Sequence, residues 1–93
     1  MPASSDPTLT TATATVVLPA DLHARPAGQI AQAAVRFRSK ATLQYGDRSA
    51  PATAILSILG LGDTAGSTIT LQTEGPDAEE ALKTLTKILA ESE

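Results

Sequence analysis

Ninety-three residues, of which 42% are hydrophobic, suffice for one domain with a modest core but not for a pocket enclosed on every side. The formal net charge of −3, the scattered basic residues and the presence of only two aromatic residues argue against nucleic acid as a main partner. The chain has no cysteine and one histidine, which excludes a disulfide framework, a thiolate nucleophile and a multi-histidine metal site. We therefore expect no metal and no cofactor.

Residues 1–9 are rich in Ser, Thr and Pro, and we expect them to form a disordered tail before a single domain over 10–93. The opening MPASSDPTLTTATA lacks the charged and apolar regions of a secretory signal. No apolar run approaches the roughly 18 residues that a membrane span needs. These features predict a soluble, cytoplasmic protein that does not insert into a membrane.

The first half of the domain changes from strand to helix periodicity. Alternation of small apolar residues with β-branched residues over 10–18 predicts a half-buried strand. The following apolar residues recur at helical spacing, which predicts a helix that begins at His23 or Ala24, with Pro26 in its first turn. The inward stripe of this helix is expected to be Ala27, Ile30, Ala31 and Ala34.

Strand periodicity returns at 40–45, and Gly46-Asp47 fits a two-residue type II′ turn into a short strand over 48–50 that ends at Pro51. Residues 53–62, TAILSILGLG, predict a short helix stopped by Gly60 and Gly62. A fourth strand follows over 67–73. The last helix is expected to open at Pro76, to carry Asp77, Glu79 and Glu80 in its first turn, and to bury Ala78, Ala81, Leu82, Leu85, Ile88 and Leu89.

The predicted element order is therefore β-α-β-β-α-β-α. Strands with one apolar face, interleaved with amphipathic helices, indicate an α+β domain in which one sheet is covered by helices on a single side.

The histidine lies at the junction of the first strand and the first helix, within DLHARPAGQ. Helix N-termini expose unpaired N–H groups and carry about half a positive charge, so they attract anions and favour the neutral, nucleophilic imidazole of His23. Arg25 adds a fork of donors that matches phosphate oxygens. Phosphoryl transfer requires mainly positioning and charge stabilisation, and these residues could together form a phosphoryl acceptor.

A structural interpretation of the same residues stands beside this one. A lone histidine near a helix start is often a surface or capping residue, an arginine there is often solvated, and Pro26 suits a first turn without any function. The slightly unfavourable charge of Arg25 at a helix N-terminus argues mildly for a role.

The stretch LHARPAGQ resembles the active-site motif of the HPr family, the phosphocarrier proteins of the bacterial phosphotransferase system. The resemblance extends without gaps from about Thr10 to the C-terminus and includes Phe37, the Gly60-Leu61-Gly62 stretch, Gly66 and the closing helix. It implies an open-faced β-sandwich in which three helices cover one side of a four-stranded antiparallel sheet.

The resemblance also implies a function and a site. His23 would be phosphorylated on Nδ1 by enzyme I, which draws the group from phosphoenolpyruvate, and would pass it to the IIA domain of a sugar permease. Arg25 and the backbone N–H groups of Ala24 and Arg25 would hold the phosphoryl group. The docking face would comprise Ala24, Gly28 and Gln32 of the first helix with Ile55, Leu56 and Leu59 of the second. Ile55 and Leu59 could equally be core residues, whereas Leu56 is expected to be exposed. The protein would be a monomeric carrier and not an enzyme with its own turnover.

The chain departs from the family pattern at several positions. Many relatives place lysines where Gln32, Val35 and Ser57 stand, so electrostatic steering towards acidic partners should be weaker. Ala54 replaces the serine that begins the second helix in relatives regulated by phosphorylation there, which predicts the absence of that regulation. Asp21 stands where glycine is common and places an extra negative charge near His23.

Three alternatives remain open. The chain could serve a nitrogen-regulatory, fructose or dihydroxyacetone phosphorelay in place of general sugar uptake. It could be a non-phosphorylated regulatory module that binds a partner through the same face, although such relatives usually lack the histidine. A small metabolic enzyme is disfavoured, because one histidine without a thiol or paired carboxylates offers little for autonomous catalysis.

Overall fold

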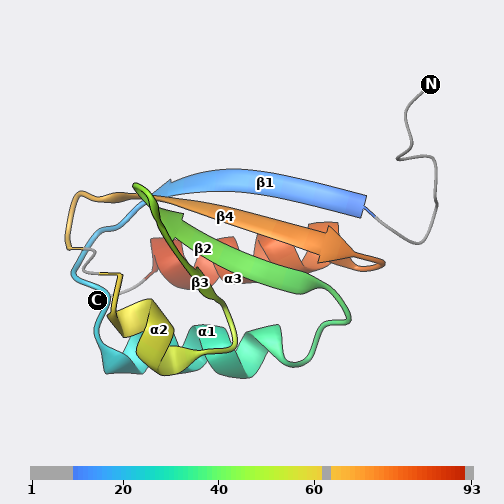
Figure 1. Cartoon of the computed structure of the whole chain (residues 1–93), viewed down its shortest axis with the longest axis horizontal. Coiled ribbons are helices and arrows are strands. Elements are labelled where there is room, and N and C mark those ends of the chain that lie inside the picture. The colour runs from blue at the N-terminus through green and yellow to red at the C-terminus, as the bar shows by residue number, and fades with distance from the viewer. Residues whose placement is uncertain (1–9, 62–63, 92–93) are drawn as a thin grey trace.

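A computed structural model describes residues 10–61 and 64–91, which form one sheet with helices on a single side (Figure 1). The elements are β1 (Thr10–Val17), α1 (Ala24–Ala34), β2 (Lys40–Tyr45), β3 (Arg48–Pro51), α2 (Ile55–Leu59), β4 (Thr68–Gly75) and α3 (Ala78–Ala90). This order confirms the predicted β-α-β-β-α-β-α succession and the α+β class. The expected tail over 1–9 and the helix stop at Gly62 lie outside the described residues.

The sheet has the strand order β1-β4-β2-β3, and all three neighbouring pairs are antiparallel. The central strands β4 and β2 bring Leu71 opposite Leu43, and both side chains are fully buried beneath the helices. The other face of the sheet carries polar side chains, chiefly threonine and glutamine, and no helix covers it (Figure 1). The fold is therefore an open-faced β-sandwich, as the resemblance implied.

The predicted inward faces of β1, α1 and α3 are confirmed. Along β1 the side chains of 11, 13, 15 and 17 are exposed, whereas those of 12, 14 and 16 are half-buried or buried. All four residues of the predicted α1 stripe are buried, and three of them, Ala27, Ile30 and Ala34, belong to the hydrophobic core. In α3, four of the six predicted stripe residues are buried, and Leu82 and Ile88 pack half-buried against the core.

Residues 46 and 47 connect β2 to β3, since Tyr45 pairs with Arg48. Gly46 has φ +63°, and no described residue other than glycine has a positive φ, so Asp47 has a negative one. This sign pattern is that of the predicted type II′ turn. Pro51, however, is the last residue of β3 and does not lie beyond it. An edge strand tolerates proline because its outward side needs no N–H donor.

Several other boundaries differ from the sequence prediction. The second helix begins at Ile55 and β4 at Thr68, where the sequence patterns began at 53 and 67. The first strand ends at Val17, one residue early, and β4 continues to Gly75 where the sequence pattern stopped at 73. The last helix begins at Ala78 and not at Pro76. Its carboxylate at Asp77 accepts hydrogen bonds from the Arg38 N–H and the Ser39 hydroxyl, which holds this residue in a turn outside the helix.

None of the helices formed by the described residues is long and apolar enough to cross a membrane.

Candidate functional site

His23 is the N-cap residue of α1, at the end of the loop that follows β1. Its backbone is extended, with φ −85° and ψ −178°, and its carbonyl oxygen accepts the first helical hydrogen bond from the Ala27 N–H at 3.1 Å. The imidazole is exposed and makes no capping hydrogen bond to the helix. Its ring nitrogens are therefore accessible to a reactant from solvent.

The first turn of α1 presents unpaired backbone donors beside His23. The N–H groups of Ala24 and Arg25 occupy positions that have no acceptor within a helix, and the His23 side chain does not cap them. Pro26 has no N–H, and the Ala27 N–H bonds the His23 carbonyl. The first turn contains no acidic side chain that could compete for these donors. An anion placed here would meet two free N–H groups and the positive end of the helix dipole.

Arg25 adds an exposed cation to this helix end. Its side chain is exposed, and it has neither a hydrogen bond nor an ion pair with any residue in 10–61 or 64–91. A guanidinium without a competing carboxylate can turn towards a phosphoryl oxygen and bind it through two donors. The structure thus gathers an accessible imidazole nitrogen, two backbone donors and a guanidinium within one helical turn.

The loop before His23 is held by a turn from a distant part of the chain. Oδ1 of Asp21 accepts a hydrogen bond of 2.7 Å from the Ala65 N–H, and its carbonyl accepts one of 3.1 Å from the His23 N–H. The sequence predicted only an extra negative charge at Asp21. No local signal could have revealed a partner 44 residues away.

The predicted docking residues of α1 lie on its outer side. Ala24 and Gln32 are exposed, and Gly28 is half-buried, with nothing within 4 Å of the place where a Cβ would stand. The spacing of four residues aligns all three along one ridge of the helix, away from the buried stripe. The second helix packs beside α1 (Figure 1).

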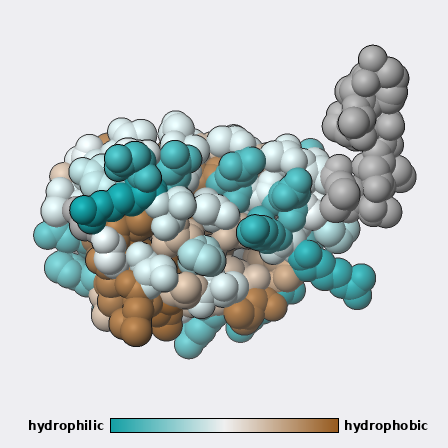
Figure 2. All heavy atoms as spheres, in the orientation of Figure 1, coloured by the Kyte–Doolittle hydropathy of each residue, from teal (hydrophilic) through white to brown (hydrophobic). Residues whose placement is uncertain are grey.

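The three predicted docking residues of α2 differ in exposure. Leu56 is 84% exposed and Ile55 is 40% exposed, whereas Leu59 is half-buried and packs against the core. The expected exposure of Leu56 is confirmed, and Ile55 is a surface residue. Figure 2 shows hydrophobic atoms gathered where α2 lies in Figure 1. An apolar surface of this kind beside a polar site is typical of protein contact.

The positions at which many relatives carry lysine lie at the surface. Gln32, Val35 and Ser57 are all exposed, and Val35 is 66% exposed at the C-cap of α1. Ala54 is the N-cap of α2 and offers no side-chain hydroxyl. Three exposed positions where a basic side chain would be expected are thus uncharged, and Val35 lies at the opposite end of α1 from His23.

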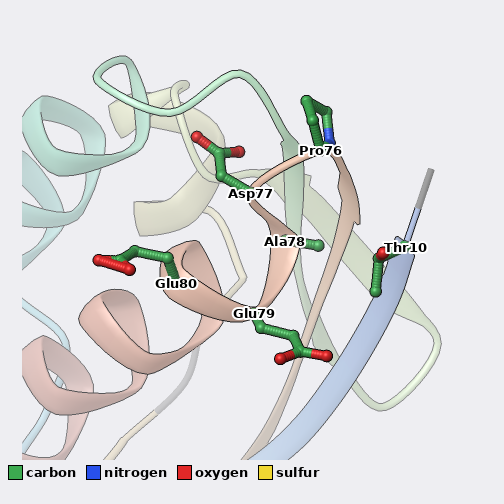
Figure 3. Close-up of a pocket in the computed structure, with 6 residues that line it drawn as sticks. All are labelled: Thr10, Pro76, Asp77, Ala78, Glu79 and Glu80. Carbon is green, nitrogen blue, oxygen red and sulfur yellow. The ribbon is translucent and has the colours of Figure 1, made fainter. Parts of the chain in front are cut away.

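A second hollow lies at the other end of β1, lined by Thr10, Pro76, Asp77, Ala78, Glu79 and Glu80 (Figure 3). Its three carboxylates point in different directions, and Asp77 is directed towards the loop that contains Ser39. No group of three His, Cys, Asp or Glu side chains able to hold a metal ion occurs among residues 10–61 and 64–91. The hollow contains none of the predicted site residues.

Comparison with protein families gives one match that covers most of the chain. The family described as "PTS HPr component phosphorylation site" matches residues 10–91. The matched range contains every predicted site residue.

Individual relatives agree with this family match. The chain is 37% identical over 78 residues to the phosphocarrier protein HPr of Buchnera aphidicola, covering 84% of this chain and 92% of the relative. It is 39% identical over 75 residues to a multiphosphoryl transfer protein of Xanthomonas campestris, of which it spans 9% of the length. The crystal structure of a phosphocarrier protein HPr from Bacillus anthracis superposes with a TM-score of 0.75 at 36% identity, covering 87% of this chain and 96% of that one.

Proposed function

The chain belongs to the HPr family of phosphocarrier proteins of the phosphotransferase system, and on that premise we propose that His23 carries a phosphoryl group between two partner proteins. Nδ1 of His23 accepts the group from phospho-enzyme I, which obtains it from phosphoenolpyruvate. The resulting phosphohistidine donates the group to the IIA domain of a sugar permease. The chain is a covalent intermediate in the cytoplasm, and turnover belongs to its partners.

The proposal is carried by the uncapped start of α1. The imidazole of His23 is exposed, and the N–H groups of Ala24 and Arg25 have no intrahelical acceptor. In the first transfer the lone pair of Nδ1 attacks phosphorus while the bond from phosphorus to enzyme I breaks. In the second transfer a nucleophile of the IIA domain attacks phosphorus while the bond from phosphorus to Nδ1 breaks, and Nδ1 regains its lone pair. The phosphoryl oxygens then meet the free N–H groups and the Arg25 guanidinium, which stabilise the charge at every stage.

Docking uses the surface formed by α1 and α2. Ala24, Gly28 and Gln32 lie on one ridge, and Ile55 and Leu56 extend it with apolar side chains, while Leu59 supports them from below. This surface is small, which suits weak and fast contacts with two successive partners better than a permanent complex. A monomer leaves it free for both partners.

Intact-mass spectrometry tests acceptance directly. The protein is incubated with phosphoenolpyruvate and enzyme I from the same organism, beside a His23→Ala variant. We expect one acid-labile phosphate on the wild-type protein and none on the variant. An unmodified wild-type protein, in a reaction in which enzyme I demonstrably phosphorylates itself, would contradict the proposal.

A further inference from the structure

We propose that Asp21 is a positioning residue for His23, and that it acts through the backbone of Ala65. This inference rests on the proposed function of His23. It concerns a contact that the sequence alone did not reveal, between the loop 18–22 and the turn 64–67.

The turn 64–67 has a defined geometry of its own. The Ser67 N–H donates to the Thr64 carbonyl at 2.9 Å, and the Thr64 N–H donates to the Ser67 hydroxyl at 3.1 Å. Gly66 has φ +87° at the third position, which is the sign that a type II turn requires there. The turn therefore has a well-defined backbone conformation, and a neighbouring loop can form hydrogen bonds to it.

Two backbone hydrogen bonds fasten the turn to the end of β1. The Leu18 N–H donates to the Ser67 carbonyl at 2.9 Å, and the Gly66 N–H donates to the Leu18 carbonyl at 2.8 Å. Leu18 itself is buried in the core. The path of the chain is thus fixed up to Leu18.

Beyond Leu18 the chain must reach the helix start across Pro19, Ala20 and Asp21. None of these three side chains is buried, and the next core anchor is Leu22, which is 5% exposed. The carboxylate of Asp21 closes this gap by accepting the Ala65 N–H at 2.7 Å. A bond of this length between a carboxylate and a backbone N–H is charge-assisted and stronger than a neutral one.

The same residue also contacts the backbone of His23. The carbonyl of Asp21 accepts the His23 N–H at 3.1 Å, so Asp21 is joined to Ala65 through its side chain and to His23 through its main chain. His23 has no side-chain hydrogen bond to the helix that would orient it otherwise. We infer that loss of the Asp21–Ala65 bond widens the range of positions open to the imidazole. Transfer then slows, because it depends on an in-line approach of the nitrogen to phosphorus.

Three variants separate the hydrogen bond from the charge. Asp21→Ala removes both, Asp21→Asn keeps an acceptor oxygen without the charge, and Gly66→Ala strains the turn from the opposite side. The Cβ in Gly66→Ala meets no atom within 4 Å, so its effect arises from the positive φ alone. Two rates of His23 phosphorylation are measured for each: with phosphoramidate, a small chemical donor, and with enzyme I at varied protein concentration.

We expect Asp21→Ala to slow phosphorylation of His23 by about three- to tenfold with both donors. In the enzyme I reaction we expect kcat to fall while KM stays unchanged. Asp21→Asn should stay within about twofold of wild type. The Ala65 amide should exchange faster with deuterium in Asp21→Ala than in wild type or Asp21→Asn. Asp21→Ala combined with Gly66→Ala should be less than additive, because both changes release the same contact.

Equal slowing in Asp21→Ala and Asp21→Asn would show that charge, and not the hydrogen bond, matters, and would overturn the inference. Unchanged rates in Asp21→Ala would overturn it as well. Both outcomes require a wild-type protein that is phosphorylated. Failure of the wild-type protein with both donors would instead contradict the proposed function, while the amide exchange of Ala65 would still report whether the contact exists in solution.

Discussion

At the scale of single residues, the site depends on a helix that lacks a conventional cap. Ser, Thr, Asp or Asn at an N-cap accepts a hydrogen bond from the first turn, and replacing such a residue by alanine costs about 0.5–2 kcal/mol. His23 holds this position and makes no such bond. The helix therefore lacks the stabilisation that a capping side chain would give, and its first N–H groups stay free to bind a phosphoryl oxygen.

This exchange predicts opposite effects on stability and on function. His23→Ser should raise the free energy of unfolding by about 1 kcal/mol relative to His23→Ala, because the serine hydroxyl can cap α1. Both variants should fail to accept phosphate. Urea unfolding of the two variants measures the difference. Equal stability of both would show that the helix start is not short of a cap.

At the scale of elements, α2 combines a core residue with residues of the proposed docking surface within five residues. Ile58 is fully buried, whereas Leu56, two positions earlier, is 84% exposed. A short amphipathic helix can therefore be divided experimentally into a structural side and a binding side.

Leu56→Ala and Ile58→Ala form a matched pair for this division. We expect Ile58→Ala to lower the free energy of unfolding by about 2–5 kcal/mol, and Leu56→Ala to change it by less than about 0.5 kcal/mol. Leu56→Ala should instead raise the KM of enzyme I for the protein. Thermal unfolding and phosphorylation kinetics measure the two effects. A normal KM in Leu56→Ala would exclude this side chain from the docking surface.

A second contact between elements joins the loop after α1 to the turn before α3. The Ser39 hydroxyl and the Arg38 N–H donate hydrogen bonds to the carboxylate of Asp77. These bonds lower the pKa of that carboxyl below the ordinary value of 3.8, and the bond from Ser39 has the larger effect. The folded state thus binds the ionised form of Asp77 more favourably than the unfolded state does. The resulting stability is fully present above the unfolded pKa and is lost as the pH falls through the lower folded pKa.

The wild-type protein should consequently lose stability relative to Asp77→Asn as the pH falls below about 4. The difference between the two proteins should be constant from pH 5 to 7 and should shrink towards pH 2. Urea unfolding at several pH values measures it. A difference that does not vary with pH would mean that the Asp77 carboxylate adds no pH-dependent stability.

At the scale of the whole molecule, sequence periodicity predicted those features that depend on residues close together in the chain, such as the inward face of a helix or strand. The inward faces of β1, α1 and α3 follow from spacing along one element, and the structure has them as expected. The His23 site was predictable for the same reason, because His23, Ala24 and Arg25 are adjacent in one helical turn. The strand order β1-β4-β2-β3 was not predicted, because it depends on pairing between strands that are far apart in the sequence.

The sequence prediction was incomplete where side chains bond across long separations. The start of α3 was placed two residues early because Asp77 bonds Ser39 and Arg38, 38 and 39 residues away. The Asp21–Ala65 bond spans 44 residues and was missed entirely. In each case the sequence pattern indicated only a local role for the aspartate, as a helix-start residue or as a charge. In the structure its carboxylate forms hydrogen bonds to a second loop.

We propose that this molecule carries a phosphoryl group from one protein to another and does not merely receive one. The most direct test is a chase experiment, in which the protein is labelled from radioactive phosphoenolpyruvate through enzyme I, purified, and mixed with a IIA domain from the same organism. We expect the label to leave the protein and appear on the IIA domain, and we expect no label on either when His23→Ala replaces the wild-type chain. Label that stays on the wild-type protein with every IIA domain of that organism would contradict the account.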